Sequence, residues 1–154
     1  MGISEIRDAM ESAIVARGCF IVDIKISKDN EIVLTVESEH GTVTLDDCVE
    51  LSRIFEEKFS RDAEDYELTV TSAGLDQPFI VLKQYLKAVG TMVEVQMKGG
   101  RKLVAMLSEA DEKGVTLKYT VRESIEGKKK KENVEHVETI PYNEMNSVRP
   151  YIEF

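Results

Sequence analysis

Residues 67–78 read ELTVTSAGLDQP, and within them a regular alternation of apolar and polar residues stops abruptly. The apolar residues of the first half would face one side and the threonines the other, which predicts a half-buried β-strand. The small residues that follow predict a tight turn, because glycine permits turn conformations and Pro78 cannot continue strand pairing. This turn is therefore predicted to join two structural modules.

Before this strand, hydrophobic periodicity predicts two helices and a hairpin. Apolar residues at 3- and 4-residue steps from Ser4, a candidate cap, to Arg17 predict a helix that the next glycine ends. Alternation over residues 20–26 and 32–36, with a polar turn between them, predicts a β-hairpin. A second helix is predicted to begin after Thr44 as its cap. One apolar stripe is predicted along it, formed by Leu45, Val49, Ser52, Phe55 and Phe59. It is widened by Cys48, Leu51 and Ile54.

After residue 90 the period becomes two almost everywhere. Five short strands are predicted, with one helical turn before the last of them: residues 92–97, 103–108, 115–121, 134–140 and 147–152. A charged loop is expected between the third and the fourth. Strands of this length with regular turn signals are typical of a small closed or half-closed barrel. The fold class is therefore predicted to be α+β, with an N-terminal α-β-β-α-β sheet domain, residues 1–84, and a small all-β barrel domain, residues 85–154.

The charge of the 154-residue chain is unevenly distributed. Residues 1–86 hold 18 acidic and 8 basic residues, a net of −10, whereas residues 87–154 hold 11 and 12, a net of +1. Because an acidic surface repels phosphate, the C-terminal half is the better candidate for nucleic acid and the acidic half suits a basic protein. No apolar run approaches the roughly 20 residues of a membrane-spanning helix, so no membrane partner is expected. The start of the chain does not resemble a secretion signal, so a cytoplasmic location is expected.

The single basic run of the sequence is GKKKK, residues 127–131. It is either a solvated hairpin loop or a finger that contacts RNA phosphates, since clustered ammonium groups release counterions from RNA. Nearby cations would extend the patch if the strands bring them together. The candidate RNA-binding residues are Lys128, Lys129, Lys130, Lys131, Arg101, Lys102 and Arg122.

No catalytic centre is recognisable in the sequence. His40 and His136 are the only histidines, and no GxSxG, HExxH or phosphate-binding glycine loop is present. Cys19 and Cys48 form neither a CxxC pair nor a zinc-binding set. We therefore expect no enzyme activity, no metal site and no cofactor.

Several motifs resemble one known family. Residues 69–79, TVTSAGLDQPF, are similar to the V-S-S-P-G-L-D-R-P-L signature of the RimP ribosome maturation factors. The resemblance extends over nearly the whole chain, with further matches at Val22-Asp23-Ile24, at residues 43–48 (VTLDDC), at Val89-Gly90 and at Ile140-Pro141-Tyr142. It implies an α/β N-terminal domain followed by an SH3- or Sm-like β-barrel. Two positions depart from the signature: Ala73 replaces the usual proline and Gln77 the usual arginine.

The resemblance implies an assembly factor without enzyme activity. Such a factor would bind the free, immature 30S small ribosomal subunit and assist its late assembly. Its partners would be ribosomal RNA and a basic small-subunit protein near the decoding region. A monomer is expected, because closed barrels leave few strand edges to pair. The family-motif turn between the domains would be formed by Ser72, Gly74, Leu75, Asp76 and Pro78.

Two alternative functions stay open at the level of the sequence. The chain could be a non-ribosomal adaptor whose barrel binds protein or peptide segments. A groove lined by exposed aromatic residues would favour it, and the candidates are Tyr119, Tyr142, Tyr151 and Phe154. An enzyme would need a pocket with a titrating histidine, either His40 or His136.

Overall fold

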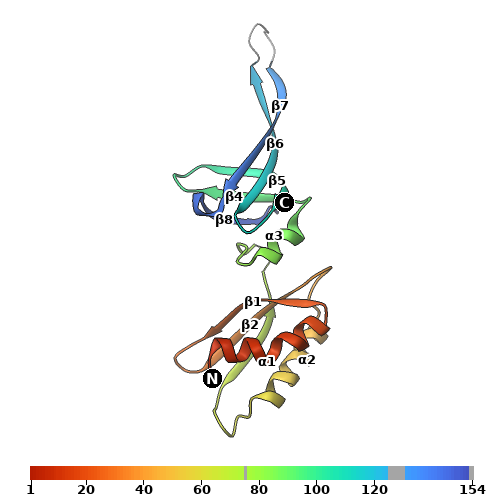
Figure 1. Ribbon diagram of the computed structural model, residues 1–154, viewed down its shortest axis with the longest axis vertical. Coiled ribbons are helices and arrows are strands. Elements are labelled where there is room, and N and C mark those ends of the chain that lie inside the picture. The colour runs from red at the N-terminus through yellow and green to blue at the C-terminus, as the bar shows by residue number, and fades with distance from the viewer. Residues whose placement is uncertain (75, 125–130, 153–154) are drawn as a thin grey trace. The chain divides into compact units, whose positions relative to one another are not determined.

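The computed structural model describes residues 1–74, 76–124 and 131–152. The chain divides into two compact units, Met1–Gly74, called unit 1, and Leu75–Phe154, called unit 2. Figure 1 shows helices and a small sheet in the first and mainly strands in the second, which confirms the α+β class. A division into domains at residues 84 and 85 stays a prediction. Among the described residues, no helix has the length and apolar content needed to cross a membrane.

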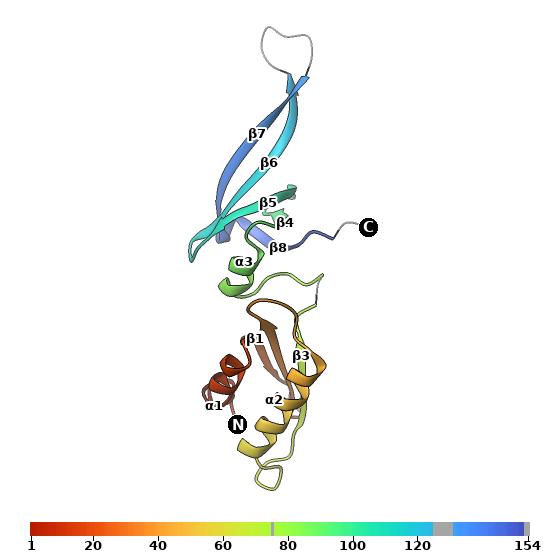
Figure 2. The ribbon, with the colours of Figure 1, turned by 90° about the vertical axis from the view of Figure 1, so that its right-hand side faces the viewer.

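Unit 1 is a three-stranded sheet with both helices on one face. Its strand order is β1-β2-β3, with β1 and β2 antiparallel and β2 and β3 parallel. Helix α1 packs on β1 and α2 on β3, as Figures 1 and 2 show. The parallel pair follows from the crossover through α2, since parallel neighbours cannot be joined by a tight turn. The elements are α1 Ile3–Ala16, β1 Cys19–Ile26, β2 Glu31–Ser38, α2 Leu45–Lys58 and β3 Glu67–Ser72.

The helix starts of unit 1 agree only partly with the prediction. The Thr44 cap is confirmed, because its Oγ1 accepts a hydrogen bond from the Asp47 N–H at 3.1 Å. The Ser4 cap is wrong: α1 begins at Ile3, and Gly2 occupies the cap position in an extended conformation. Gly2 has no side-chain oxygen to offer as a cap, and its own N–H donates to Glu5 Oε1 at 3.4 Å.

The predicted apolar stripe of α2 is correct at one end of the helix and wrong at the other. Leu51 and Phe55 are completely buried against the sheet. Leu45 and Val49, by contrast, are 80% and 61% exposed. Sequence periodicity gives the face of a helix but not where the surface beneath that helix ends. The first two turns of α2 therefore present apolar side chains to solvent.

Unit 2 is a five-stranded antiparallel sheet with one short helix. The strand order is β7-β6-β5-β4-β8, so β7 and β8 lie at opposite ends of the sheet. No pairing between those two strands closes the sheet within the described residues, in contrast to a closed barrel. The argument for a monomer from barrel closure therefore does not apply. The elements are α3 Leu82–Ala88, β4 Met92–Met97, β5 Lys102–Ala110, β6 Gly114–Ser124, β7 Lys131–Pro141, the 3-10 turn η1 Tyr142–Glu144 and β8 Met145–Pro150.

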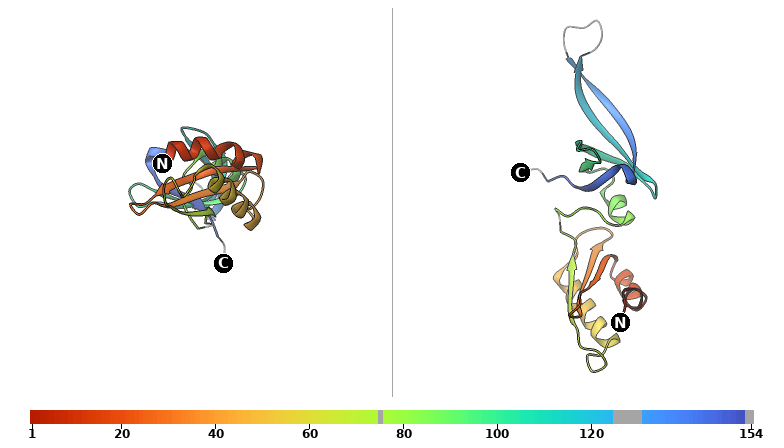
Figure 3. Two further views of the ribbon diagram at one scale, coloured as in Figure 1. Left: turned by 90° about the horizontal axis from the view of Figure 1, so that it is seen from below. Right: turned by 90° about the vertical axis from the view of Figure 1, so that its left-hand side faces the viewer.

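Strands β6 and β7 extend farther than the sequence predicts. Each has 11 residues, and their pairing continues through Arg122 opposite Asn133 to Ser124 opposite Lys131. The predicted charged loop over residues 122–133 is therefore wrong at both ends. Polar residues are compatible with strands here because this part of the hairpin projects beyond β5, as Figure 3 shows, and has few apolar neighbours. The core of unit 2 lies at the base of the hairpin, around Leu107, Leu117 and Ile140.

Candidate nucleic-acid interface

The family-motif turn lies at the chain junction of the two units. Ser72 is the last residue of β3 and Gly74 the last residue of unit 1. Leu75 lies outside the described residues. Asp76 and Pro78 belong to unit 2, and the side chain of Gln77 donates to Asp76 Oδ1 at 3.3 Å.

Two contacts attach this turn to β8. The guanidinium of Arg149 donates from Nη1 to the backbone oxygen of Asp76 at 3.4 Å. The N–H of Phe79, directly after Pro78, donates to the carbonyl of Val148 at 2.8 Å. The residues after the junction thus bind β8 through their own backbone atoms. These contacts do not depend on the side chain at position 77.

Arg101 is held in a polar network with two strands of the hairpin. Its guanidinium binds the Glu138 carboxylate, with Nη2 to Oε1 at 3.1 Å, and also donates to the Tyr119 hydroxyl at 3.1 Å. The Tyr119 hydroxyl in turn donates to Glu138. The hydrogen bond from Arg101, followed by that from Tyr119, lowers the pKa of Glu138. Because the charge of Arg101 is matched by this carboxylate, Arg101 contributes little attraction for phosphate.

The register of unit 2 places five of its cations on one side of the sheet. Cross-strand partners point to the same face of a sheet, so Lys118 lies on the face of Met106 and Arg149 on the face of Glu94. We call this the outer face, and it is the one opposite Leu117. Its basic residues come from four strands, and they are Lys102, Lys118, Arg122, Lys131 and Arg149.

The predicted RNA-binding residues are therefore only partly brought together. Lys102, Arg122 and Lys131 share the outer face, although Lys102 is paired with Glu94 at 2.7 Å. Arg101 lies on the other side with Glu138, and residues 128–130 lie outside the described residues. Sequence reasoning missed Lys118 and Arg149. The signal for Lys118 was present, since it precedes Arg122 by four residues in a strand and must share its face.

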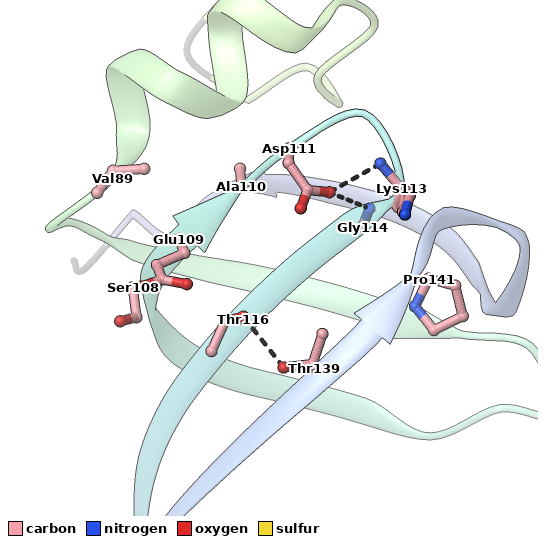
Figure 4. A pocket seen from close by; sticks show the side chains of 10 residues that line it. All are labelled: Val89, Ser108, Glu109, Ala110, Asp111, Lys113, Gly114, Thr116, Thr139 and Pro141. Atoms are coloured by element: carbon pink, nitrogen blue, oxygen red, sulfur yellow. Dashed lines mark hydrogen bonds between the residues drawn. The ribbon is translucent and has the colours of Figure 1, made fainter.

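A surface hollow of about 550 Å³ opens on the outer face at the base of the hairpin, as Figure 4 shows. The Thr116 and Thr139 hydroxyls lie 3.1 Å apart across its floor. At its rim, Asp111 Oδ1 accepts hydrogen bonds from the N–H groups of Lys113 and Gly114, at 2.8 and 3.0 Å. These bonds lower the pKa of Asp111 and fix the turn. The hollow thus presents hydroxyls and the ammonium group of Lys113 beside the carboxylates of Glu109 and Asp111.

The aromatic candidates do not form a common groove among the described residues. Tyr142 packs with Tyr85, at 5.1 Å between ring centroids, and burial raises the pKa of Tyr85 to about 12. Tyr119 instead stacks on His136 at 5.3 Å, and Tyr151 follows β8 and is exposed. Phe154 lies outside the described residues. These separate positions give the peptide-binding adaptor no shared aromatic site.

The pocket with a histidine that the enzyme alternative requires is not formed at this hollow. His40 lies in an exposed bend, and His136 lies on β7, so neither lines the hollow. No group of three or more histidine, cysteine, aspartate or glutamate side chains is placed to hold a metal ion there. The arrangement of unit 2 can bind anions over a strand surface, which is a binding function.

Comparisons with known proteins agree with this architecture. The model of the RimP N-terminal domain matches residues 9–76. The chain is 32% identical over 123 residues to the ribosome maturation factor RimP of Flavobacterium psychrophilum, covering 80% of this chain and 79% of that protein. It is 30% identical over 135 residues to the protein of that name from Christiangramia forsetii, covering 88% and 87%. A third relative with that name, from Porphyromonas gingivalis, is 34% identical over 112 residues, or 73% of each chain.

Proposed function

Because this chain belongs to the RimP family of ribosome maturation factors, we propose that it binds the free, immature 30S small ribosomal subunit and assists its late assembly. The observation that carries the proposal is the separation of charge between two compact units of one such chain. In this proposal the protein acts in the cytoplasm as a monomer, without enzyme activity and without a cofactor.

The outer face of unit 2 is the proposed RNA contact. Five basic residues lie on it from four strands, and its acidic residues are Glu94, already paired with Lys102, Glu109 and Glu135. Phosphate contacts of this kind position a protein on RNA without reading its sequence. The hydroxyls of Thr116 and Thr139 in the hollow can donate hydrogen bonds to RNA phosphates. We keep Lys128, Lys129 and Lys130 as proposed phosphate contacts beside Lys131.

Unit 1 is the proposed contact for a basic small-subunit protein. Residues 1–74 hold 17 acidic and 7 basic residues, a net of −10, and residues 75–154 hold 12 and 13, a net of +1. A binding site on the small subunit that includes both a basic protein and exposed RNA would be accessible only on a precursor. A mature subunit that has buried either one would release the factor. We propose that one turn connects the protein-binding unit to the RNA-binding unit. It is formed by Ser72, Gly74, Leu75, Asp76 and Pro78.

Co-sedimentation with separated ribosomal subunits, at low and at raised salt, tests the proposal. We expect binding to free small subunits and not to large subunits, and a loss of binding as salt rises, because the contacts are ionic. Binding to neither subunit at low salt would contradict the proposal and would favour the non-ribosomal adaptor.

A further inference from the structure

We propose that the open edge of β3 in unit 1 is a docking edge for an extended basic segment of a small-subunit protein. That segment would pair with β3 as a fourth strand and would bury Leu45 and Val49 of α2. This inference rests on the proposed function, since it names the surface and the form in which the protein partner is bound.

The two edges of the unit 1 sheet differ in regularity. Strand β1 has a register irregularity between Ile21 and Asp23, a feature that discourages further pairing. Strand β3 pairs with β2 without any shift and contains neither proline nor lysine. A flat edge without such protection is a template for another strand, and native proteins normally cover it.

The backbone of β3 has hydrogen-bonding groups to offer at this edge. The Glu67 N–H donates to the carbonyl of Asn30 at 3.1 Å, on the β2 side. Because successive residues of a strand point their amides to opposite edges, the N–H groups of Leu68, Val70 and Ser72 point to the open edge. Within the described residues, no backbone hydrogen bond joins these three N–H groups to another segment.

The apolar layer between sheet and helices is incomplete along β3. Ile32 and Leu34 of β2 are 1% and 0% exposed. Leu68 and Val70 are their direct partners in register and face the same side, yet both are only half-buried. An apolar side chain from an added strand would complete this burial, at about 25 cal/mol for each Å² removed from water.

Leu45 and Val49 lie on the flank of α2 above this edge. Asp47 faces α1, because it binds Arg17 Nε at 2.9 Å. Leu45 and Val49 are each two residues from Asp47, which places them on the opposite side of the helix. Since α1 lies over β1 and α2 over β3, as in Figure 2, that side is toward the open edge of the sheet. A strand added to β3 would meet these two side chains with every second residue.

The charge around the edge selects the partner. Asp46 on α2, Asp65 before β3 and Glu67 at its start are exposed acidic residues. RNA would be repelled by this surface, whereas lysine and arginine side chains of an extended protein segment would be attracted. Main-chain pairing would then supply affinity, and the alternation of apolar and basic residues would supply specificity.

The test uses the full chain and the proteins extracted free of RNA from purified small subunits of the same organism. Hydrogen–deuterium exchange is followed over residues 67–72, with and without this mixture. The variant L45K/V49K changes the docking flank. The matched control I3K/V15K places the same charges on α1. Ile3, like Leu45, is the first residue of its helix, and Val15, like Val49, is an exposed valine; Ile3 is 47% and Val15 59% exposed. Sedimentation with intact small subunits is measured in parallel.

We expect the mixture to slow exchange over residues 67–72 in the wild type and in I3K/V15K. In L45K/V49K the apparent affinity should fall by about tenfold or more, since two buried contacts are replaced by repulsion. Three results would overturn the inference: no protection over residues 67–72, equal protection in both variants, or protection produced by stripped ribosomal RNA or by a second copy of this chain. Failure of the wild type to sediment with small subunits would instead contradict the proposed function, whatever the exchange result.

Discussion

The two units of this chain carry charge in different ways. In unit 1 the excess of acid belongs to the whole module, because carboxylates occur on both helices, in the loops and on the strands. Unit 2 is close to neutral, and strand register places five of its cations on the outer face, while Arg101 is paired with Glu138 on the other side. Net charge thus predicts the partner of unit 1, whereas the partner of unit 2 depends on the charges of each face of its sheet.

Removing the centre of one core should have the largest effect. Phe55 is completely buried in unit 1. We expect Phe55→Ala to lower the free energy of unfolding of unit 1 by about 3–5 kcal/mol, because the cavity cannot collapse fully. Amide exchange during denaturant unfolding, followed separately for β2 and β6, measures it. Equal destabilisation of both strands would contradict the description of the units as separate cores.

A smaller loss of stability is expected in unit 2 from Gly114→Ala. A Cβ added to Gly114 would lie 2.2 Å from the carbonyl oxygen of Ile140. Relief requires a backbone shift between β6 and β7, which should cost about 1–3 kcal/mol in thermal unfolding. Gly41→Ala in unit 1 is the control, since its Cβ would meet nothing within 4 Å. If the two variants were equally stable, the close approach of β6 and β7 at this point would be wrong.

The outer face is tested by charge reversal. We expect Lys118→Glu with Arg122→Glu to weaken binding to 16S-type ribosomal RNA by about tenfold and to reduce its salt dependence by about one unit for each lost phosphate contact. Filter binding at several salt concentrations measures both. The control is Lys25→Glu with Lys58→Glu in unit 1, which changes the net charge equally. Equal losses in the two variants would show that only net charge matters.

The smallest effect concerns acid stability. The Thr44 N–H, and then Arg17, lower the pKa of Asp47. The stabilisation from Asp47 is therefore fully present above its unfolded-state pKa of about 3.9 and is lost as the pH falls through its lower folded-state pKa. The difference in unfolding temperature between wild type and Asp47→Asn should shrink as the pH falls below about 4. A difference that is constant with pH would contradict a charged role for Asp47.

Much of unit 1 could be predicted from local signals. The β1–β2 hairpin, the Thr44 cap and the end of α1 before Gly18 each depend on neighbouring residues. The exposure of Leu45 and Val49 could not be predicted, because it depends on how far the sheet extends beneath α2. That property belongs to the packed unit and not to the periodicity of the helix.

The candidate site of unit 2 was less predictable. A side chain's face depends on strand register, which an irregularity such as that between Leu107 and Glu109 shifts by one residue. The sequence grouped Arg101 with Arg122, although Arg101 binds Glu138, which lies on the face opposite Arg122. It also could not show that Glu138, 37 residues after Arg101, would bind it.

Crosslinking of the complex with free small subunits would show which unit contacts RNA and which contacts protein. Ultraviolet crosslinks report contacts with RNA, and lysine- or carboxylate-reactive reagents report contacts with protein. We expect RNA crosslinks on the outer face of unit 2, at β6 and β7, and protein crosslinks on unit 1 near α2 and β3. RNA crosslinks concentrated on unit 1 would contradict the division of partners between the two units.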